Sequence, residues 1–136
     1  MRDPGNLGTI IRLCDWFGVT SLICSEGTVD CYNPKVVQAT MGSLARVEVI
    51  YTDLKSYIEN STRETYGTFM EGENIYESEV ATQAIIVMGN EANGITQDIT
   101  QILKNKISIP RFGSQKVTES LNVAMATSIF LSEFRR

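Results

Sequence analysis

The sequence predicts an α/β domain with a mostly parallel sheet and helices on both of its faces. Short β-branched or apolar runs alternate with amphipathic stretches, which is the pattern of parallel strands joined by helical crossovers. The chain has 136 residues, 43% of them apolar, which is enough for one domain with a substantial core. It shows no internal repeat, low-complexity tract or linker.

The first half of the chain predicts three helices and two strands. The expected elements are a helix at 6–17, a strand at 19–24, a helix at 33–41, a strand at 47–51 and a helix at 53–59. Apolar side chains recur at helical spacing from Leu7 to Phe17, and Gly18 ends that helix. Asn33 and Pro34 open the second helix, with proline at its first position.

The second half predicts strands at 65–70, 84–88 and 107–109, and helices at 98–103 and 120–134. Residues 84–88 are apolar throughout, so we expect this strand to be buried on both faces. The last helix is apolar on two sides, more than its own sheet requires, which predicts a homodimer interface through it. One side holds Val123, Ala126, Phe130 and Phe134, and the other holds Leu121, Ala124, Met125 and Leu131.

Composition excludes several classes of chemistry. The chain has no histidine, which removes Ser-His-Asp and Cys-His nucleophile systems, histidine-ligated zinc and imidazole as a general base. The net charge of −4 argues against a protein that coats nucleic acid with a basic surface. Cys14, Cys24 and Cys31 show no C-x-x-C spacing, so we expect buried reduced thiols and no metal site. No stretch has the length of a membrane span or the pattern of a signal peptide, which predicts a cytoplasmic protein.

The first segment of unusual composition is residues 3–12. Asn6 is expected to cap the helix. Gly8 costs helix stability by about 1 kcal/mol relative to alanine, which indicates that something approaches the backbone closely there. Arg12, one turn further on, is placed to meet an anionic group such as a phosphate. The alternative is an exposed arginine on an ordinary helix.

Two further segments follow strands. Residues 89–96 place Glu91 between two glycines, in a pattern that is neither a Walker A loop nor G-x-G-x-x-G. Such glycines expose backbone groups to a small ligand, although a plain turn would use them too. In residues 110–122, Ser120 and Asn122 open the last helix, and capping is the commonest use of both residue types.

Together the three segments resemble one family. The motifs D-P-x-N-L-G-x-I-I-R, G-N-E-x-x-G-I, and I-P followed by E-S-L-N-V-A-x-A stand in the order found in the SpoU (TrmH-type) branch of the SPOUT methyltransferases. Residues 67–77 also resemble the family's less regular middle stretch. The resemblance implies S-adenosylmethionine-dependent methylation of an RNA ribose 2′-hydroxyl, with ribosomal RNA slightly ahead of transfer RNA as substrate. It also implies a deep C-terminal trefoil knot, an exception to the rule that chains are unknotted.

The resemblance also implies roles for individual residues. The cofactor pocket would be lined by Met88, Gly89, Ile109 and Leu121, with Thr68 at its rim. Arg12 would activate the ribose hydroxyl or, as the very weak basicity of a guanidinium favours, clamp a phosphate and stabilise the developing alkoxide. Asn6 and Glu91 would orient Arg12, and Ser120 and Asn122 would hold the knot and contact substrate or cofactor. In the implied dimer, Asn6 and Arg12 of one chain face the cofactor of the other.

The chain departs from the family in two ways. Ala124 replaces a serine often found after S-L-N-V, a mild change. No strand precedes the first helix and no N-terminal RNA-binding domain is present, so residues 1–136 are expected to be most of a knotted catalytic domain. Two other interpretations stay open: a non-catalytic relative that binds RNA or assists ribosome assembly, and a flavodoxin-like or nucleotide-binding module with accidental glycine loops.

Overall fold

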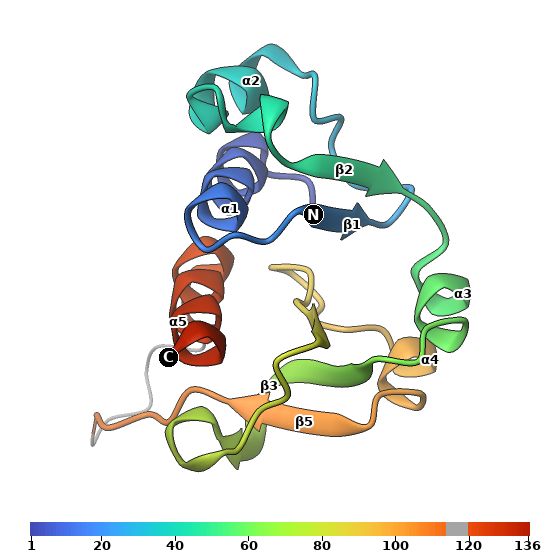
Figure 1. The fold of residues 1–136 in the computed structure, drawn as a ribbon, viewed down its shortest axis with the longest axis vertical. Helices are drawn as coiled ribbons and strands as arrows, with labels where there is room; N and C mark the ends of the chain where they lie inside the picture. The colour runs from blue at the N-terminus through green and yellow to red at the C-terminus, as the bar shows by residue number, and fades with distance from the viewer. Residues whose placement is uncertain (114–119) are drawn as a thin grey trace. The chain divides into compact units, whose positions relative to one another are not determined.

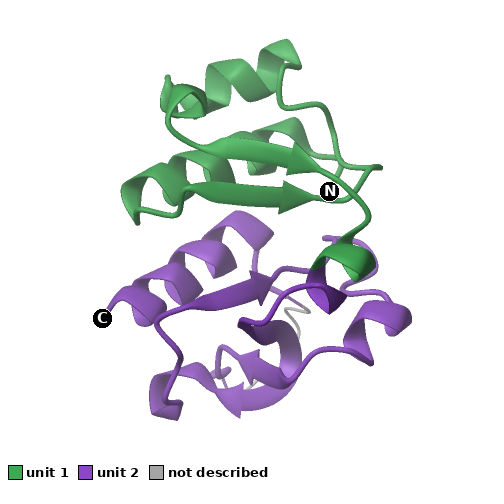
Figure 2. Cartoon of the chain, turned by 45° about the vertical axis from the view of Figure 1, so that its right-hand side comes forward, with its two compact units in different colours: residues 1–57 green, residues 58–136 purple. Residues whose placement is uncertain are grey.

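The computed structural model describes residues 1–113 and 120–136. The chain divides into two compact units, residues 1–57 and 58–136 (Figure 2). All pairs of named strands are parallel, and helices alternate with them along the chain, which confirms the α/β prediction. The strands form two sheets, β1-β2 in unit 1 and β4-β3-β5 in unit 2.

Unit 1 is a two-stranded parallel sheet with its helices (Figure 1). Strands β1 (Ser21–Cys24) and β2 (Glu48–Tyr51) pair along their full length. The helices are α1 (Pro4–Trp16), α2 (Pro34–Thr40) and the short 3-10 turn η1 (Ser43–Ala45), and α3 (Leu54–Glu59) spans the boundary between the units. Each predicted element of this half is confirmed, with ends shifted by up to two residues.

The start of α1 differs from the prediction in one respect. Asp3, not Asn6, is the N-cap, and its carboxylate accepts the backbone N–H groups of Gly5 and Asn6 at 2.8 and 3.1 Å. Pro4 then occupies the first helical position, where its missing N–H costs nothing. Asn6 therefore lies inside the first turn of the helix, and its side chain is not the cap.

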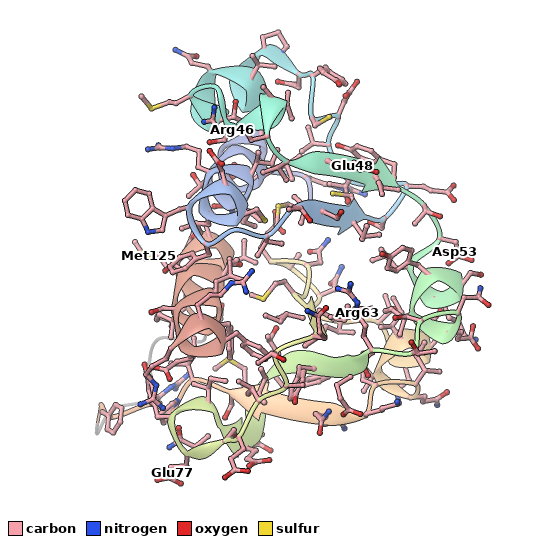
Figure 3. The ribbon with its side chains drawn as sticks, in the orientation of Figure 1. Arg46, Glu48, Asp53, Arg63, Glu77 and Met125 are labelled. Carbon is pink, nitrogen blue, oxygen red and sulfur yellow. The ribbon has the colours of Figure 1, made fainter. Side chains whose placement is uncertain are left out.

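The end of α1 is joined to η1 by a charged network. Asp15 accepts hydrogen bonds from the Ser43 hydroxyl at 2.9 Å and from the Arg46 guanidinium, whose Nη2 lies 2.8 Å away. The hydrogen bonds from Arg46 and Ser43 hold the pKa of Asp15 below its usual value. Arg46 stands at the end of η1, with its side chain largely exposed (Figure 3). This network orders the turn that leads from α2 into β2.

Gly8 is where α2 packs against α1. Gly8 is buried, and a Cβ added there would collide with the Ala39 side chain and come within 3.0 Å of the Val36 carbonyl oxygen. The close approach predicted from Gly8 is therefore confirmed, and the approaching group is α2. Arg12 on the same helix is exposed.

We expect Gly8→Ala to destabilise the protein by about 1–3 kcal/mol, because overpacking forces the two helices apart. Denaturant unfolding measures this change. Removing the opposing methyl group in Gly8→Ala/Ala39→Gly should recover part of the loss. Gly27→Ala, where a Cβ meets nothing within 4 Å, is the matched control. Equal stabilities of the Gly8→Ala and Gly27→Ala variants would contradict this packing argument.

Unit 2 is built on three parallel strands. Strand β3 (Glu64–Asn74) is central, with β4 (Ala84–Val87) on one side and β5 (Asn105–Ser108) on the other. The remaining elements are η2 (Ile75–Glu77), α4 (Gln97–Thr100) and α5 (Val123–Arg135). Strand β3 is longer than the predicted 65–70, because after a register shift between Thr68 and Glu73 it pairs again with β5 (Figure 1).

The core of unit 2 joins the sheet to α5. Tyr66, Ile75, Ile107 and Phe130 are buried together. The Tyr66 ring meets Phe134 edge to face at 5.0 Å, and its hydroxyl accepts the Ala81 N–H at 3.0 Å. Each such buried apolar side chain contributes about 1.5–3 kcal/mol of transfer free energy, so this cluster anchors the last helix to the strands.

The burial of side chains in the structure tests three of the predictions. In β4 only Val87 is buried and the other three residues are half-buried, so the expectation of burial on both faces was wrong. On the second predicted apolar side of the last helix, Ala124 and Leu131 are buried, whereas Leu121 and Met125 are 49% and 65% exposed (Figure 3). Half of this side is therefore exposed in the single chain, and the homodimer interface stays a prediction. The three cysteines are free and buried, as predicted, and burial raises the pKa of Cys14 and Cys24 to about 11.

None of the helices in the described part of the chain has the length and apolar character that crossing a membrane demands. The knot stays a prediction, because its closing loop includes residues 114–119, which lie outside the described residues.

Candidate functional site

The carboxyl ends of three strands meet at one edge of the unit 2 sheet. Because β3, β4 and β5 are parallel, the residues that follow β4 and β5 emerge at the same edge. Met88 and Gly89 follow β4, and Ile109 follows β5. Thr68 on β3 pairs with Ile107 and comes directly after the Gly67–Val87 pair, so it lies at this edge as well. Four residues predicted for the cofactor pocket thus share one end of the sheet.

Thr68 joins β3 to the end of β4. Its hydroxyl donates a hydrogen bond to the Val87 carbonyl oxygen at 3.1 Å, at the last residue of β4. This bond restrains the point where the chain leaves β4 and enters the Met88-Gly89 turn. Thr68 therefore fixes the end of β4 relative to β3, at the edge where it is predicted to border the cofactor pocket.

The loop after β4 is closed by its own backbone. Asn90 and Gly94 exchange two hydrogen bonds, of 3.1 and 2.8 Å, and the Asn90 side chain accepts the Ala92 N–H at 2.7 Å. Gly94 has φ +69°, which favours glycine. Gly89 is required for a different reason: a Cβ there would lie 2.8 Å from two backbone atoms of Gly94 and 2.9 Å from the Ile95 nitrogen.

The apolar members of the site are only partly covered by protein. Met88 and Ile109 pack against the core cluster of unit 2 and are half-buried. Leu121, which precedes α5, is 49% exposed. Partly exposed apolar side chains beside a tightly closed backbone loop suit a ligand with an apolar face and groups that hydrogen-bond to the main chain.

The remaining predicted residues of unit 2 lie at loop and helix ends. Asn122 is the N-cap of α5, and its side-chain oxygen accepts the N–H groups of Ala124 and Met125 at 2.9 and 3.3 Å. The capping interpretation of Asn122 is thereby confirmed. Ser120 is exposed just ahead of it, and Glu91 is exposed in the closed loop. Asn122 therefore sets where α5 begins, directly after Leu121.

Asn6 and Arg12 belong to unit 1. Both lie on α1, with Asn6 in its first turn and Arg12 exposed two turns later. The backbone N–H of Asn6 is taken by the Asp3 cap. The structure thus brings four of the five predicted cofactor residues of unit 2 to one sheet edge, and Asn6 and Arg12 lie on one helix.

Two contributors were missed from the sequence. Asp3 could have been found, because an aspartate directly before a proline at a helix start is a capping signal. Asn90 could not, because its role depends on a pairing with Gly94 that closes only in the folded loop. Among the described residues, no group of three potential ligand side chains is placed to hold a metal ion.

Comparison with known proteins gives one consistent result. The model of the SpoU rRNA Methylase family matches residues 1–132. The chain is 30% identical over 139 residues to the 23S rRNA (guanosine(2553)-2'-O)-methyltransferase RlmP of Bacillus subtilis, covering 99% of this chain and 55% of that protein. The chain spans about half the length of the curated relatives it matches.

Solved structures agree in fold. A TrmH-family protein from Porphyromonas gingivalis superposes with a TM-score of 0.90 at 40% identity, over 99% of this chain and 56% of that one. An rRNA methyltransferase from Sinorhizobium meliloti with AdoMet bound gives a TM-score of 0.88 at 31% identity, over 99% of this chain and 52% of that one.

Proposed function

This chain belongs to the SpoU rRNA methylase family, and we propose that it transfers a methyl group from S-adenosylmethionine to a ribose 2′-hydroxyl of RNA. The observation that carries the proposal is the sheet edge where Thr68, Met88, Gly89 and Ile109 converge beside the closed loop. Ribosomal RNA is the favoured substrate, ahead of transfer RNA, and the relative from Bacillus subtilis is named for a 23S rRNA position. The cytoplasm is the proposed site of action.

The residues present fit S-adenosylmethionine. Met88, Ile109 and Leu121 offer apolar surface for an adenine ring, and the Gly89 backbone offers polar groups without a side chain in the way. Thr68 would border the pocket while its hydroxyl restrains the end of β4. When bound, the cofactor would supply an electrophilic methyl group on a sulfonium sulfur. After the transfer, that sulfur would be part of a neutral thioether.

The chain must then orient a ribose hydroxyl and accept or stabilise the charge that develops on it. Without histidine, Arg12 is our candidate for this task. A guanidinium is a very weak base but a strong bidentate donor to phosphate, and it can also donate to an alkoxide. We assign Arg12 to clamping the substrate phosphate and stabilising the alkoxide, and the hydroxyl proton passes to a phosphate oxygen of the substrate or to water, because a protonated guanidinium has no lone pair to accept it.

The other predicted residues support this arrangement. Asn6 and Glu91 orient Arg12 and brace its loop, and Ser120 contacts substrate or cofactor. Asn122 would make the same contact, and it is also the N-cap of α5, directly after Leu121. We further propose a homodimer through α5, in which Asn6 and Arg12 of one copy face the cofactor of the other. The exposed Met125 on α5 suits such a contact.

Two measurements, made one after the other, test the proposed function. Titration calorimetry should show S-adenosylmethionine binding to the wild-type protein, and transfer of labelled methyl groups to unmodified rRNA should follow. Mapping of methylated riboses in a deletion strain then identifies the nucleotide. Failure to bind the cofactor would remove the proposal, whereas cofactor binding without transfer to any RNA would favour a non-catalytic relative.

A further inference from the structure

Trp16, the single tryptophan of the chain, is exposed on the helix that carries Arg12. It is 84% exposed at the last position of α1, and Arg12, four residues earlier, is exposed as well. Residues four apart lie on the same face of a helix, about 6 Å from one another along its axis. The two side chains therefore form one exposed surface, in which an aromatic ring lies next to a cation.

The carboxylate next to Trp16 is neutralised within the fold. Asp15 is the only carboxylate of α1, and it is paired with the Arg46 guanidinium at 2.8 Å and accepts the Ser43 hydroxyl at 2.9 Å. The elements packed against α1 in unit 1 are α2, η1 and β1, and none of them carries a carboxylate. The ion pairs among the described residues do not include Arg12. The charge that α1 presents beside the Trp16 ring is therefore the positive charge of Arg12.

Most other carboxylates of unit 1 lie away from this surface. Asp3 caps the far end of α1, about 20 Å from Trp16 at a rise of about 1.5 Å per residue, which exceeds the Debye length of about 8 Å. Because α1 ends shortly before β1 begins, Trp16 lies toward the amino ends of the two parallel strands. The loops at the opposite, carboxyl ends of these strands hold Glu26, Asp30 and Asp53. Glu48 begins β2, and Figure 3 shows it on that strand, apart from Arg46.

Tyr32 is an exposed ring of unit 1 with the opposite surroundings. It is 73% exposed, and the Asp30 carboxylate accepts its backbone N–H at 2.9 Å. The ion pairs among the described residues do not include Asp30. A phosphate is repelled by this carboxylate, whereas Arg12 attracts one beside Trp16. Tyr32 therefore provides a matched control for an exposed ring without a cation.

We propose that the Trp16 ring stacks on a base of the substrate RNA, next to the phosphate that Arg12 holds. The inference rests on the proposed function, which assigns Arg12 to a substrate phosphate, and it adds a second substrate contact on α1. One ribose joins a phosphate to its base, so a ring one helical turn from the phosphate clamp reaches a base of the same or the adjacent nucleotide.

The electrostatics of α1 favour this order of contacts. The carboxyl end of a helix carries a partial negative charge, which disfavours a phosphate at Trp16 and leaves the ring to a neutral base. Exposed aromatic rings beside cations are the usual platform for unstacked RNA bases. Because every base has a π face, the contact would select an unpaired base without reading its sequence.

The experiment uses the single tryptophan as its own probe. Binding of a short oligouridylate should quench the Trp16 fluorescence, whereas a strand of the same length with abasic riboses should bind more weakly and without quenching. Trp16→Ala should weaken oligouridylate binding about tenfold and raise KM for unmodified rRNA more than it lowers kcat. Trp16→Phe should retain most of the affinity, and Tyr32→Ala should match the wild type in both quenching and affinity.

Several outcomes would overturn the inference. They are oligouridylate binding without quenching, equal quenching by the abasic strand, equal affinities of Trp16→Ala and the wild type, or equal losses in Tyr32→Ala. A smaller mass in sedimentation for Trp16→Ala would also overturn it, because the ring would then pack against a second copy. Calorimetry with S-adenosylmethionine on each variant separates these results from failure of the proposed function, since Trp16→Ala should bind the cofactor as the wild type does.

Discussion

Replacing Arg12 with alanine is expected to abolish methyl transfer and leave S-adenosylmethionine binding within about twofold of the wild type. The expected loss in kcat is at least about 10²–10³-fold, the scale seen when one charge-stabilising donor is removed from an active site. Arg12 is exposed on α1, and its removal leaves no cavity in the core, so stability should change little. The measurement is transfer of labelled methyl groups to rRNA, together with calorimetry for the cofactor.

Two companion variants sharpen this result. Arg12→Lys keeps the positive charge and loses the bidentate geometry, so partial activity is expected. Lys35→Ala removes one cation from an exposed position at the start of α2, and it should retain activity. If Arg12→Ala loses cofactor binding and transfer equally, the assignment of Arg12 to the ribose and phosphate is wrong.

Gly89→Ala is expected to weaken S-adenosylmethionine binding by about tenfold or more, which corresponds to about 1.4 kcal/mol per factor of ten. The added methyl group would lie 2.8 Å from two backbone atoms of Gly94. A backbone contact cannot be relieved by rotating a side chain, and two hydrogen bonds close this loop. The loop must therefore open or move away from the edge of the sheet, and the proposed pocket moves with it.

The controls separate a displaced loop from an unfolded protein. Gly27→Ala should leave cofactor affinity and stability unchanged, because nothing lies within 4 Å of its Cβ. Thr68→Val removes the hydrogen bond to the Val87 carbonyl without crowding the loop and should weaken cofactor binding to a smaller extent. Wild-type affinity in a folded Gly89→Ala variant would mean that the cofactor does not use this loop.

Elements with strong local signals were predicted well. Asn33 followed by Pro34 starts α2, where the Asn33 side chain accepts the Lys35 N–H at 2.9 Å. Gly18 ends α1 with φ 72°. Strand β3 was underestimated because its second half carries three polar residues and a glycine and pairs only with the end of β5, a partner more than thirty residues away. The cap of α1 was misplaced by three residues because Asp3 and Asn6 are both good capping residues.

The sequence by itself determined the α/β class, the order of the elements and the family, because periodicity, caps and ordered motifs are local properties of the chain. Only the tertiary structure decided what the glycines are for. Gly8 makes room for α2, Gly89 for the backbone of Gly94, and Gly94 adopts a left-handed conformation. It also decided which of the residues predicted for the cofactor pocket share one edge of the unit 2 sheet, since parallel pairing brings Thr68, Met88 and Ile109 to that edge. The physical reason is that close approach and strand register depend on partners distant in sequence, which no local pattern specifies.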